Sequence, residues 1–498
     1  MNGKEKHQKA VKYIIIVFFV IGVITRANQF FYNKSLWVDE AMLALNVVER
    51  DYKQLLQTLD YNQMAPVGFL LISKFVGSLT KYADWGLRLV PFLTALASLY
   101  LFWLLLRYLL PENANRLVQL ISVILFACSF RLMYFASEFK QYSSDVFWAL
   151  LVLLVSLRAD LLQKPKRLIT ALLVGAIGLW FSHPLIFVLA GIGIYWVVEN
   201  FYQNTLTNWF KTILLGIGWL SSFLIEYLFI LSKDGNVGYM QQYWKGNFLP
   251  LFPTNRYDFE IWLYIPEELF YYTIGVSHMS WLLMFIAITG VITFWHQQAR
   301  WVIALVLPFL IVIASSMLQL YPYNSRLLLF LTPLVAIIVG KGTSELLYKL
   351  QKPLGLAVLL SFLVLSQPIA LGVLYIFRPM EREEVKPILQ HYQAYAKHSD
   401  VLYVYYGAVP AVKYYYMTQF SNLPGKIVFG NSARQKIVQN FSTELEQIKT
   451  IKPQRIWLLF SHVFEKEDVQ SLELVRAFWK EKQKISTTGA SLYLFEHK

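Results

Sequence analysis

Two adjacent carboxylates, Asp39 and Glu40, stand in the segment "SLWVDEAMLAL", just after the first apolar stretch of the chain. A third acid, Glu138, precedes a cation, Lys140, in the later segment "YFASEFKQYSSDV". Ionisable residues at membrane depth are functional candidates by default, because burying a charge in lipid is costly. Acids from separate loops can supply a general base and a second, orienting acid. Asp39, Glu40 and Glu138 are therefore candidate catalytic residues.

Cationic and aromatic side chains stand at the ends of other apolar stretches. The candidate binding residues are Arg88, Lys140, Tyr142, His183, Tyr323 and Arg326. Arginine can bind a phosphate through two hydrogen bonds, and lysine can bind it as a point charge. At a lipid boundary such cations suit a lipid-linked phosphate. If that phosphate carries a sugar, an acid can deprotonate an acceptor hydroxyl while the cations stabilise the departing phosphate. Fixed cations could do this without a metal, although two carboxylates and a histidine could also bind a divalent cation.

The composition indicates a polytopic α-helical membrane protein. Of the 498 residues, 56% are hydrophobic and only 15% are charged, whereas soluble domains contain about 25% charged residues. A net charge of +14 in such a protein reflects topology and anionic lipid, and we expect no nucleic-acid partner. The single cysteine, Cys128, excludes an intrachain disulfide and a cysteine-based zinc site. The first apolar stretch, "YIIIVFFVIGVI", lacks a small-residue cleavage site, so we expect a retained span.

A membrane span needs about 20 apolar residues, and the sequence predicts about eleven spans. We place them at 13–32, 87–109, 117–135, 146–162, 168–182, 184–200, 212–231, 279–295, 301–320, 327–345 and 354–377. Lysine and arginine gather in the N-terminal segment and in the loops after the fourth and tenth spans, which marks that side as cytoplasmic. The outer face then receives 33–86, 232–278 and 378–498.

The outer segments predict structure of their own. Residues 40–59 place apolar side chains at helical spacing, which fits an amphipathic helix on the membrane surface or a packed extramembrane helix. Residues 378–498 alternate β-rich runs ("DVLYVYY", "KIVFG", "RIWLLF", "ASLYLFE") with helical ones ("STELEQIKTI", "EDVQSLELVRAFWKEKQ"). The sequence thus predicts a transmembrane domain, 1–377, and a small extracytoplasmic α/β domain, 378–498.

Four segments resemble a known family in the same order. "WVDEA" resembles the Asp-Glu signature of membrane-embedded glycosyltransferases with the C-type fold, which include protein O-mannosyltransferases and the aminoarabinose transferase of lipid A. "APVGFLLISKFVGSLTKYADWGLRLVPFLTAL", "SEFKQYSSDVFWALL" and "YPYNSRLLLFLTPL" resemble later motifs of the bacterial set. The resemblance covers residues 10 to about 380.

This resemblance implies a transferase that uses a polyprenyl-phosphate sugar donor, with its site facing the periplasm or exterior. Asp39 is then the expected base with Glu40 beside it, Glu138 and Lys140 face them, and Arg88 and Arg326 are candidates for the lipid phosphate. The family often has a basic residue or histidine before a Pro-Pro pair in the first loop. This chain has "NQMAPVG" there, so Lys140 or Arg88 is expected to take that role.

Some of these acids also have a purely structural interpretation. Asp39 could be the N-cap of the helix that begins with "EAMLALNVV", since aspartate is a preferred cap. Asp145 could cap the span that it opens. Glu138 and Lys140 could form a plain surface ion pair, which contributes little to stability.

The cations and aromatic residues also have alternatives. Arg88 and Arg326 could be interfacial anchors whose charged ends reach toward water. His183, which precedes Pro184, could simply end a helix in a hairpin. Most tyrosines fit a membrane-interface aromatic belt, and Tyr142 and Tyr323 stand out only through their motif neighbours.

The sequence therefore predicts a hexosyl or pentosyl transferase of a bacterial inner membrane. Its acceptor would be a polysaccharide, a lipid or a protein, and its donor would arrive through the membrane lipid. A transporter or lipid flippase is a rival from another class, because many spans and acids suit it. A non-catalytic lipid-sugar binding protein of the same fold is a third alternative.

Overall fold

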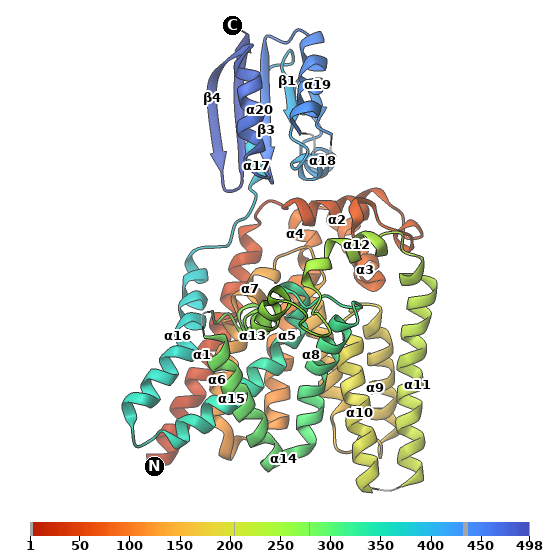
Figure 1. Ribbon diagram of the computed structural model, residues 1–498, viewed down its shortest axis with the longest axis vertical. Helices are drawn as coiled ribbons and strands as arrows, with labels where there is room; N and C mark the ends of the chain where they lie inside the picture. The colour runs from red at the N-terminus through yellow and green to blue at the C-terminus, as the bar shows by residue number, and fades with distance from the viewer. Residues whose placement is uncertain (1–2, 204, 278, 432–436, 498) are drawn as a thin grey trace. The chain divides into compact units, whose positions relative to one another are not determined.

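The computed structural model describes residues 3–203, 205–277, 279–431 and 437–497, and Figure 1 traces them by colour along the chain. The chain divides into two units, which we name the helical unit and the mixed unit. The helical unit comprises Met1–Phe31, Lys53–Ile72 and Arg88–Pro379, and the mixed unit comprises Tyr32–Tyr52, Ser73–Leu87 and Met380–Lys498. Two pieces of the first predicted outer loop therefore fold together with the C-terminal residues.

The helical unit follows the apolar runs of the sequence, because a helix satisfies its backbone hydrogen bonds internally in lipid. The helices that lie over the predicted spans are α1 (Gly3–Tyr32), α5 (Leu89–Leu109), α6 (Glu112–Ala127), α8 (Tyr142–Ser156), α9 (Pro165–Leu179), α10 (Leu185–Gln203), α11 (Leu206–Phe229), α14 (Ser280–Met317), α15 (Thr332–Lys349) and α16 (Leu354–Phe377). The unit also contains α7 (Phe130–Phe135), α12 (Val237–Tyr243) and α13 (Arg256–Ile274), with the 3-10 segment η5 (Ser325–Leu331) before α15. Helix α3 (Val67–Leu79) begins in this unit and ends in the other.

Seven helices among the described residues are long and apolar enough to cross a membrane. Helix α14 covers two of the predicted spans, 279–295 and 301–320. Its 38 residues are interrupted at Gln298, where φ is −155° and ψ is 61°. An unbroken helix of that length would measure about 57 Å, whereas the bilayer core is about 30 Å thick. The break thus divides α14 into two segments of roughly membrane length.

The remaining predicted spans coincide with shorter helices. The third lies over α6 and α7, and the fourth and fifth overlap α8 and α9. Their lengths of 16, 15 and 15 residues for α6, α8 and α9 are below the roughly 20 residues of a full span. The structure therefore shows a polytopic helical protein whose membrane helices differ widely in length.

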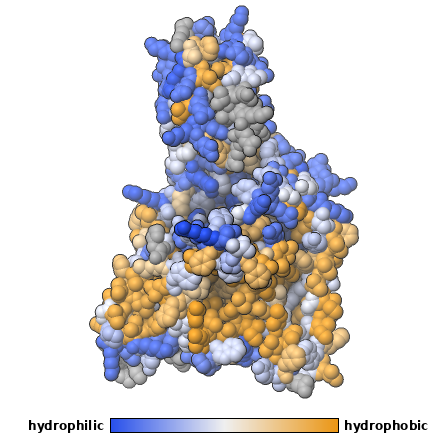
Figure 2. Space-filling model, in the orientation of Figure 1, coloured by the Kyte–Doolittle hydropathy of each residue, from blue (hydrophilic) through white to orange (hydrophobic). Residues whose placement is uncertain are grey.

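Burial separates a central helix from lipid-facing ones. In the most apolar window of Ser325–Lys349, 89% of the residues are buried, but in that of Leu206–Lys233 only 17% are. Gly290 and Gly342 let α14 and α15 approach closely, since a Cβ on Gly342 would lie 1.9 Å from the carbonyl oxygen of Ile286. Small residues at such contacts are typical of membrane helices. Figure 2 shows a broad hydrophobic surface over the helical unit, as lipid contact requires.

The mixed unit contains a five-stranded sheet in the order β2-β1-β3-β5-β4. Strands β1, β2 and β3 are parallel, and β5 pairs antiparallel with β3 and β4. The elements of this unit are α2 (Val38–Glu49), α4 (Asp84–Leu87), α17 (Val385–Tyr395), β1 (Val401–Val404), α18 (Val409–Thr418), β2 (Lys426–Phe429), α19 (Ile437–Thr450), β3 (Arg455–Ser461), α20 (Glu467–Arg476), β4 (Trp479–Thr487) and β5 (Ala490–His497). Aromatic and aliphatic side chains of the strands and of α19 and α20 form its core.

Two sequence-based boundaries were wrong. The helix predicted over 467–483 ends at Arg476, and Trp479–Thr487 is strand β4. Exposed lysines on this strand discourage another strand from pairing with this edge of the sheet. Their polarity also fits the surface of a helix, which explains the wrong prediction. The helix predicted over 40–59 ends at Glu49, because Arg50 is extended. Helix α2 is buried on several faces and contacts α18, which favours the packed helix over the surface helix.

Candidate active site

The predicted site residues are divided between the two units. Asp39 and Glu40 belong to the mixed unit. The others belong to the helical unit: Glu138, Arg88, Lys140, Tyr142, His183, Tyr323 and Arg326.

Lys140 belongs to one contact network in the helical unit. It lies in the turn between α7 and α8, is 5% exposed, and donates a hydrogen bond from Nζ to Oε1 of Gln63 at 2.7 Å. Asn236, just before α12, binds the same segment, because its Nδ2 donates to the carbonyl oxygens of Leu59 and Gln63 at 2.8 and 3.0 Å. Residues 59–63 of the first predicted outer loop are therefore contacted both by the turn before α8 and by the predicted outer loop 232–278.

Burial decides between two interpretations of Glu138, Lys140 and Arg88. Glu138 is completely buried, and its carbonyl oxygen accepts a hydrogen bond from the backbone N–H of Lys140 at 2.7 Å. Because both side chains are buried, a plain surface ion pair is ruled out. Arg88 is 1% exposed, so it is not an interfacial anchor reaching toward water. Charged groups buried this deeply need specific partners, which fits a functional role.

Arg326 lies between two aromatic rings of the helical unit. Its guanidinium carbon is 5.7 Å from the ring centroid of Tyr142 and 5.7 Å from that of Trp244. Tyr142 is buried at the start of α8 and packs edge-on against Phe135. Cation–π contacts of this kind help to hold a guanidinium in place. Trp244, in the predicted outer loop 232–278, was not among the predicted site residues.

Tyr323 helps to line a pocket beside α13. Its hydroxyl donates to the carbonyl oxygen of Ile265 at 3.3 Å, and its backbone N–H donates to that of Asn247 at 2.9 Å. The pocket has a volume of about 200 Å³, and Glu268 also lines it. The Glu268 carboxylate accepts a hydrogen bond from the backbone N–H of Ser325 at 3.0 Å. Burial raises the pKa of Glu268 despite that bond, and sequence reasoning missed this acid.

His183 lies between α9 and α10 as expected, and its partner is an acid that sequence reasoning missed. Its Nε2 is 3.4 Å from Oε1 of Glu226, which is 1% exposed in α11. Glu226 stands within the predicted span 212–231, and an acid there is a functional candidate by default. That signal could have identified it. The structure thus shows that His183, in a tight connection, also lies close to a buried acid.

Asp39 and Glu40 occupy the first turn of α2. The N-cap residue is Trp37, whose side chain makes no capping hydrogen bond. Asp39 is therefore not the N-cap, and the capping interpretation was wrong. Asp145 likewise lies inside α8, whose N-cap is Gln141. Acids in a first turn are stabilised by the helix dipole, and Glu40 is completely buried.

The positions of the acidic, histidine and cysteine side chains also bear on metal binding. Within the part of the chain that the structure describes, no group of three or more His, Cys, Asp or Glu side chains is placed to hold a metal ion. What the two units do provide is buried acids and buried cations, which suit proton transfer and anion binding.

This architecture is the GT-C fold of membrane-embedded glycosyltransferases, as the four motifs predicted. A crystal structure of ArnT from Cupriavidus metallidurans bound to undecaprenyl phosphate is similar over 98% of both chains, with a TM-score of 0.54 and 9% identity. An apo structure of the same protein has a TM-score of 0.54 and 10% sequence identity, also over 98% of both chains. The oligosaccharyltransferase of Archaeoglobus fulgidus, in complex with Zn and sulfate, has a TM-score of 0.51 and 11% sequence identity. The similarity covers 96% of this chain and 72% of that one. No family model and no curated protein matches the sequence.

Proposed function

We propose that the protein is a glycosyltransferase that moves a sugar from a polyprenyl-phosphate donor to an acceptor on the outer face of the membrane. The observation that carries this proposal is the fold shared, over 98% of both chains, with ArnT bound to undecaprenyl phosphate. The buried cations Lys140 and Arg88 support it, because a lipid-linked phosphate needs positive charge at the membrane boundary.

In the proposed reaction Asp39 is the general base. It accepts the proton of an acceptor hydroxyl while the oxygen bonds to the anomeric carbon of the sugar. The bond between that carbon and the donor phosphate breaks in the same displacement, so the sugar configuration inverts. Arg88, Lys140 and Arg326 stabilise the charge on the departing phosphate. Glu40 and Glu138 support the base and orient the acceptor.

The aromatic outer loop 232–278 is the proposed cover for the sugar. It supplies Trp244 against Arg326, and it supplies Glu268 and Asn247 to the pocket beside α13. Carboxylate and carboxamide groups are suitable partners for sugar hydroxyls. Aromatic faces stack on the apolar side of a sugar ring. A hexose or a pentose suits such a lining.

Charge distribution supports an extracytoplasmic site in a bacterial inner membrane. The basic N-terminal segment and the basic loops beside Arg167 and Lys349 stand on the side assigned to the cytoplasm. The segments that carry the candidate residues then belong to the opposite face, with residues 378–498 forming an extracytoplasmic domain. The acceptor is proposed to be a polysaccharide, lipid or protein of the cell envelope.

The test is cryo-EM of the purified full-length protein in lipid nanodiscs with added undecaprenyl phosphate. The expected result is phosphate density within hydrogen-bond reach of Lys140 or Arg326, with the polyprenyl chain running out toward lipid. A well-ordered map with no lipid phosphate there, and with a polar cavity at the middle of the bilayer, would overturn the proposal in favour of a transporter or flippase.

A turnover assay separates the enzyme from a binding protein of the same fold. The protein would be given a panel of undecaprenyl-phosphate-linked hexoses and pentoses, and release of undecaprenyl phosphate would be followed. Tight donor binding with no release from any donor, in the presence of membranes from the same cells as an acceptor source, would indicate a non-catalytic lipid-sugar binding protein.

A further inference from the structure

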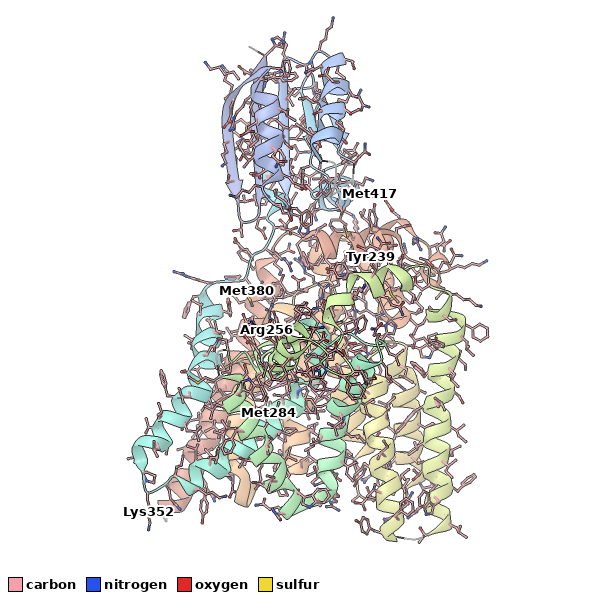
Figure 3. All side chains as sticks on the ribbon, in the orientation of Figure 1. Tyr239, Arg256, Met284, Lys352, Met380 and Met417 are labelled. Atoms are coloured by element: carbon pink, nitrogen blue, oxygen red, sulfur yellow. The ribbon has the colours of Figure 1, made fainter. Side chains whose placement is uncertain are left out.

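Residues 381–384, which we call the strap, bind the segment that leads into α2. The strap follows Met380, which is labelled in Figure 3. The carboxylate of Glu384 accepts hydrogen bonds from the backbone N–H and the hydroxyl of Ser35, at 3.1 and 2.9 Å. Oε2 of Glu383 accepts one from the backbone N–H of Val38 at 2.9 Å. The strap thus binds the backbone up to the residue before Asp39.

Helix α2 depends on this strap for its cap. The first N–H groups of any helix have no partner within the helix and need an acceptor. Trp37, at the N-cap, supplies none from its side chain, and the carboxylate of Glu383 takes that role for Val38. A carboxylate at this end also interacts favourably with the helix dipole. Arg382 covers the Trp37 ring, with its guanidinium carbon 3.3 Å from the ring centroid.

His462 ties the same carboxylate to the sheet. It follows the last residue of β3, and its Nδ1 lies 2.7 Å from Oε1 of Glu383. The two oxygens of Glu383 therefore bridge the end of a central strand and the first N–H of α2. Because β3 pairs with strands on both sides, its end is a rigid support.

The turn between β4 and β5 holds the backbone of the strap. The N–H of Glu384 donates to the carbonyl oxygen of Thr488 at 2.8 Å, and the Thr487 hydroxyl donates to the carbonyl oxygen of Glu384 at 2.8 Å. Gly489 has φ of +67°, and a Cβ there would lie 2.1 Å from the carbonyl oxygen of Arg382. Only glycine allows this approach without strain. The strap is therefore fastened to the sheet at both its backbone and its side chains.

A second support runs from α18 to the same segment. The hydroxyl of Tyr415 accepts a hydrogen bond from the backbone N–H of Leu36 at 2.7 Å and donates to Oδ2 of Asp84 at 2.9 Å. Asp84 is 1% exposed and also pairs with Nζ of Lys386 at 2.8 Å. Leu36 and Val38, two residues apart, are thus bound from two different elements.

We propose that Glu383, Glu384, His462 and Tyr415 are positioning residues for catalysis. They hold the first turn of α2 and so set where the carboxylates of Asp39 and Glu40 stand. The C-terminal sheet then supports the helix that carries the catalytic base. This inference rests on the proposed function, in which Asp39 is the base. A displacement of about 1 Å at a reacting group can lower a rate about 100-fold.

The experiment compares Glu383→Ala with Glu383→Gln in the full-length protein in nanodiscs. Alanine removes the acceptor for Val38, whereas glutamine keeps an oxygen for Val38 but loses the charge and places an NH2 group toward His462. Glu473→Ala, an exposed carboxylate of α20, is the matched control. Each variant is measured for hydrogen exchange of the amides at 35–38, for kcat on the best donor of the panel, and for affinity for undecaprenyl phosphate.

For Glu383→Ala we expect exchange at Val38 to be about fivefold faster or more, as for loss of a helix cap. We expect kcat to fall about 10- to 100-fold with unchanged affinity for undecaprenyl phosphate. Glu383→Gln should recover most of kcat, and Glu473→Ala should match the wild type. If Glu383→Ala does not fold, Tyr415→Phe provides the same comparison at the Leu36 amide.

Three results would overturn the inference, and they differ from one another. Unchanged exchange at 35–38 in Glu383→Ala would show that the strap does not hold α2. Faster exchange with an unchanged kcat, while Asp39→Asn is inactive, would show that the contacts between the strap and α2 have no catalytic effect. That result would leave Asp39 as the base. Full turnover in Asp39→Asn would remove the base role from the proposed function, and the positioning role would fall with it.

Discussion

Nζ of Lys140 lies 2.7 Å from Oε1 of Gln63. Gln63 belongs to "NQMAPVG", the segment in which the C-type glycosyltransferases often carry a basic residue. In this chain the cation comes from the loop between α7 and α8 and reaches the same segment through space. The segment that lacks a basic residue of its own is thus contacted by a lysine from elsewhere in the helical unit. Lys140 is therefore the first candidate ligand for the donor phosphate.

Replacing Lys140 or Arg88 by alanine should weaken binding of undecaprenyl phosphate. A charged hydrogen bond typically contributes about 1.5–3 kcal/mol, so each Kd should rise about 10- to 100-fold. Lys245→Ala removes an exposed lysine of the outer loop and should leave the affinity unchanged. Binding can be measured by native mass spectrometry in nanodiscs. Wild-type affinity in both variants would rule out these residues as phosphate ligands.

Asp39→Asn should abolish measurable transfer while the protein still folds and inserts into the membrane. General base catalysis contributes about 10²- to 10⁴-fold, and asparagine keeps the shape of the side chain without its proton affinity. The matched control is Asp51→Asn, an exposed aspartate two residues after the end of α2. Turnover of the panel donor and thermal unfolding would be measured for both. Near-normal turnover in Asp39→Asn would remove it from the base role.

The proposed sidedness can be tested by cysteine labelling. Cys128 is buried, so Cys128→Ala provides a background in which single cysteines are introduced at exposed positions. Tyr239, Arg256 and Lys352, labelled in Figure 3, are all exposed. A membrane-impermeant maleimide should label Tyr239→Cys and Arg256→Cys in intact spheroplasts, but should label Lys352→Cys only after the membrane is opened. The reverse pattern would place the outer loop 232–278 on the cytoplasmic side.

Glu268 should give the stability of the helical unit a pH dependence. Burial raises the pKa of this carboxyl, so the native state binds its proton more tightly than the unfolded state, whose glutamate pKa is about 4.3. As pH rises from there through the native pKa, the native state loses stability. Glu268→Gln should therefore lose less thermal stability than the wild type as the pH rises above about 4.3. The control is Glu260→Gln, a half-exposed position on α13 whose carboxylate pairs with Arg256, which should follow the wild type.

The sequence predicted membrane helices well and their ends less well. Apolar runs define spans because lipid excludes unpaired backbone groups, so the positions of α5, α11 and α16 agree with the predicted spans. Local pattern could not show that 479–487 is a strand, because a polar edge strand and an exposed helix share a similar composition. The length of α2 was likewise missed, since its end depends on the extended Arg50 and on packing against α18.

Candidate acids and cations were identified from their positions beside apolar runs, and burial then decided among their interpretations. Glu138 and Arg88 are too deeply buried to be surface groups. Glu268 and Trp244 were missed, because neither stands in a motif and each is defined by a neighbour from another element. Glu226 was also missed, although an acid within a predicted span was a signal for it.

By itself, the sequence determined that this is a helical membrane protein with acids and cations at the ends of its spans, since hydropathy and charge are properties of short segments. Only the tertiary structure decided which distant residues meet. Lys140 reaches Gln63 across 77 positions, and Glu383 caps Val38 across 345. Such contacts depend on how the elements pack, and packing is a property of the whole chain that no local pattern encodes.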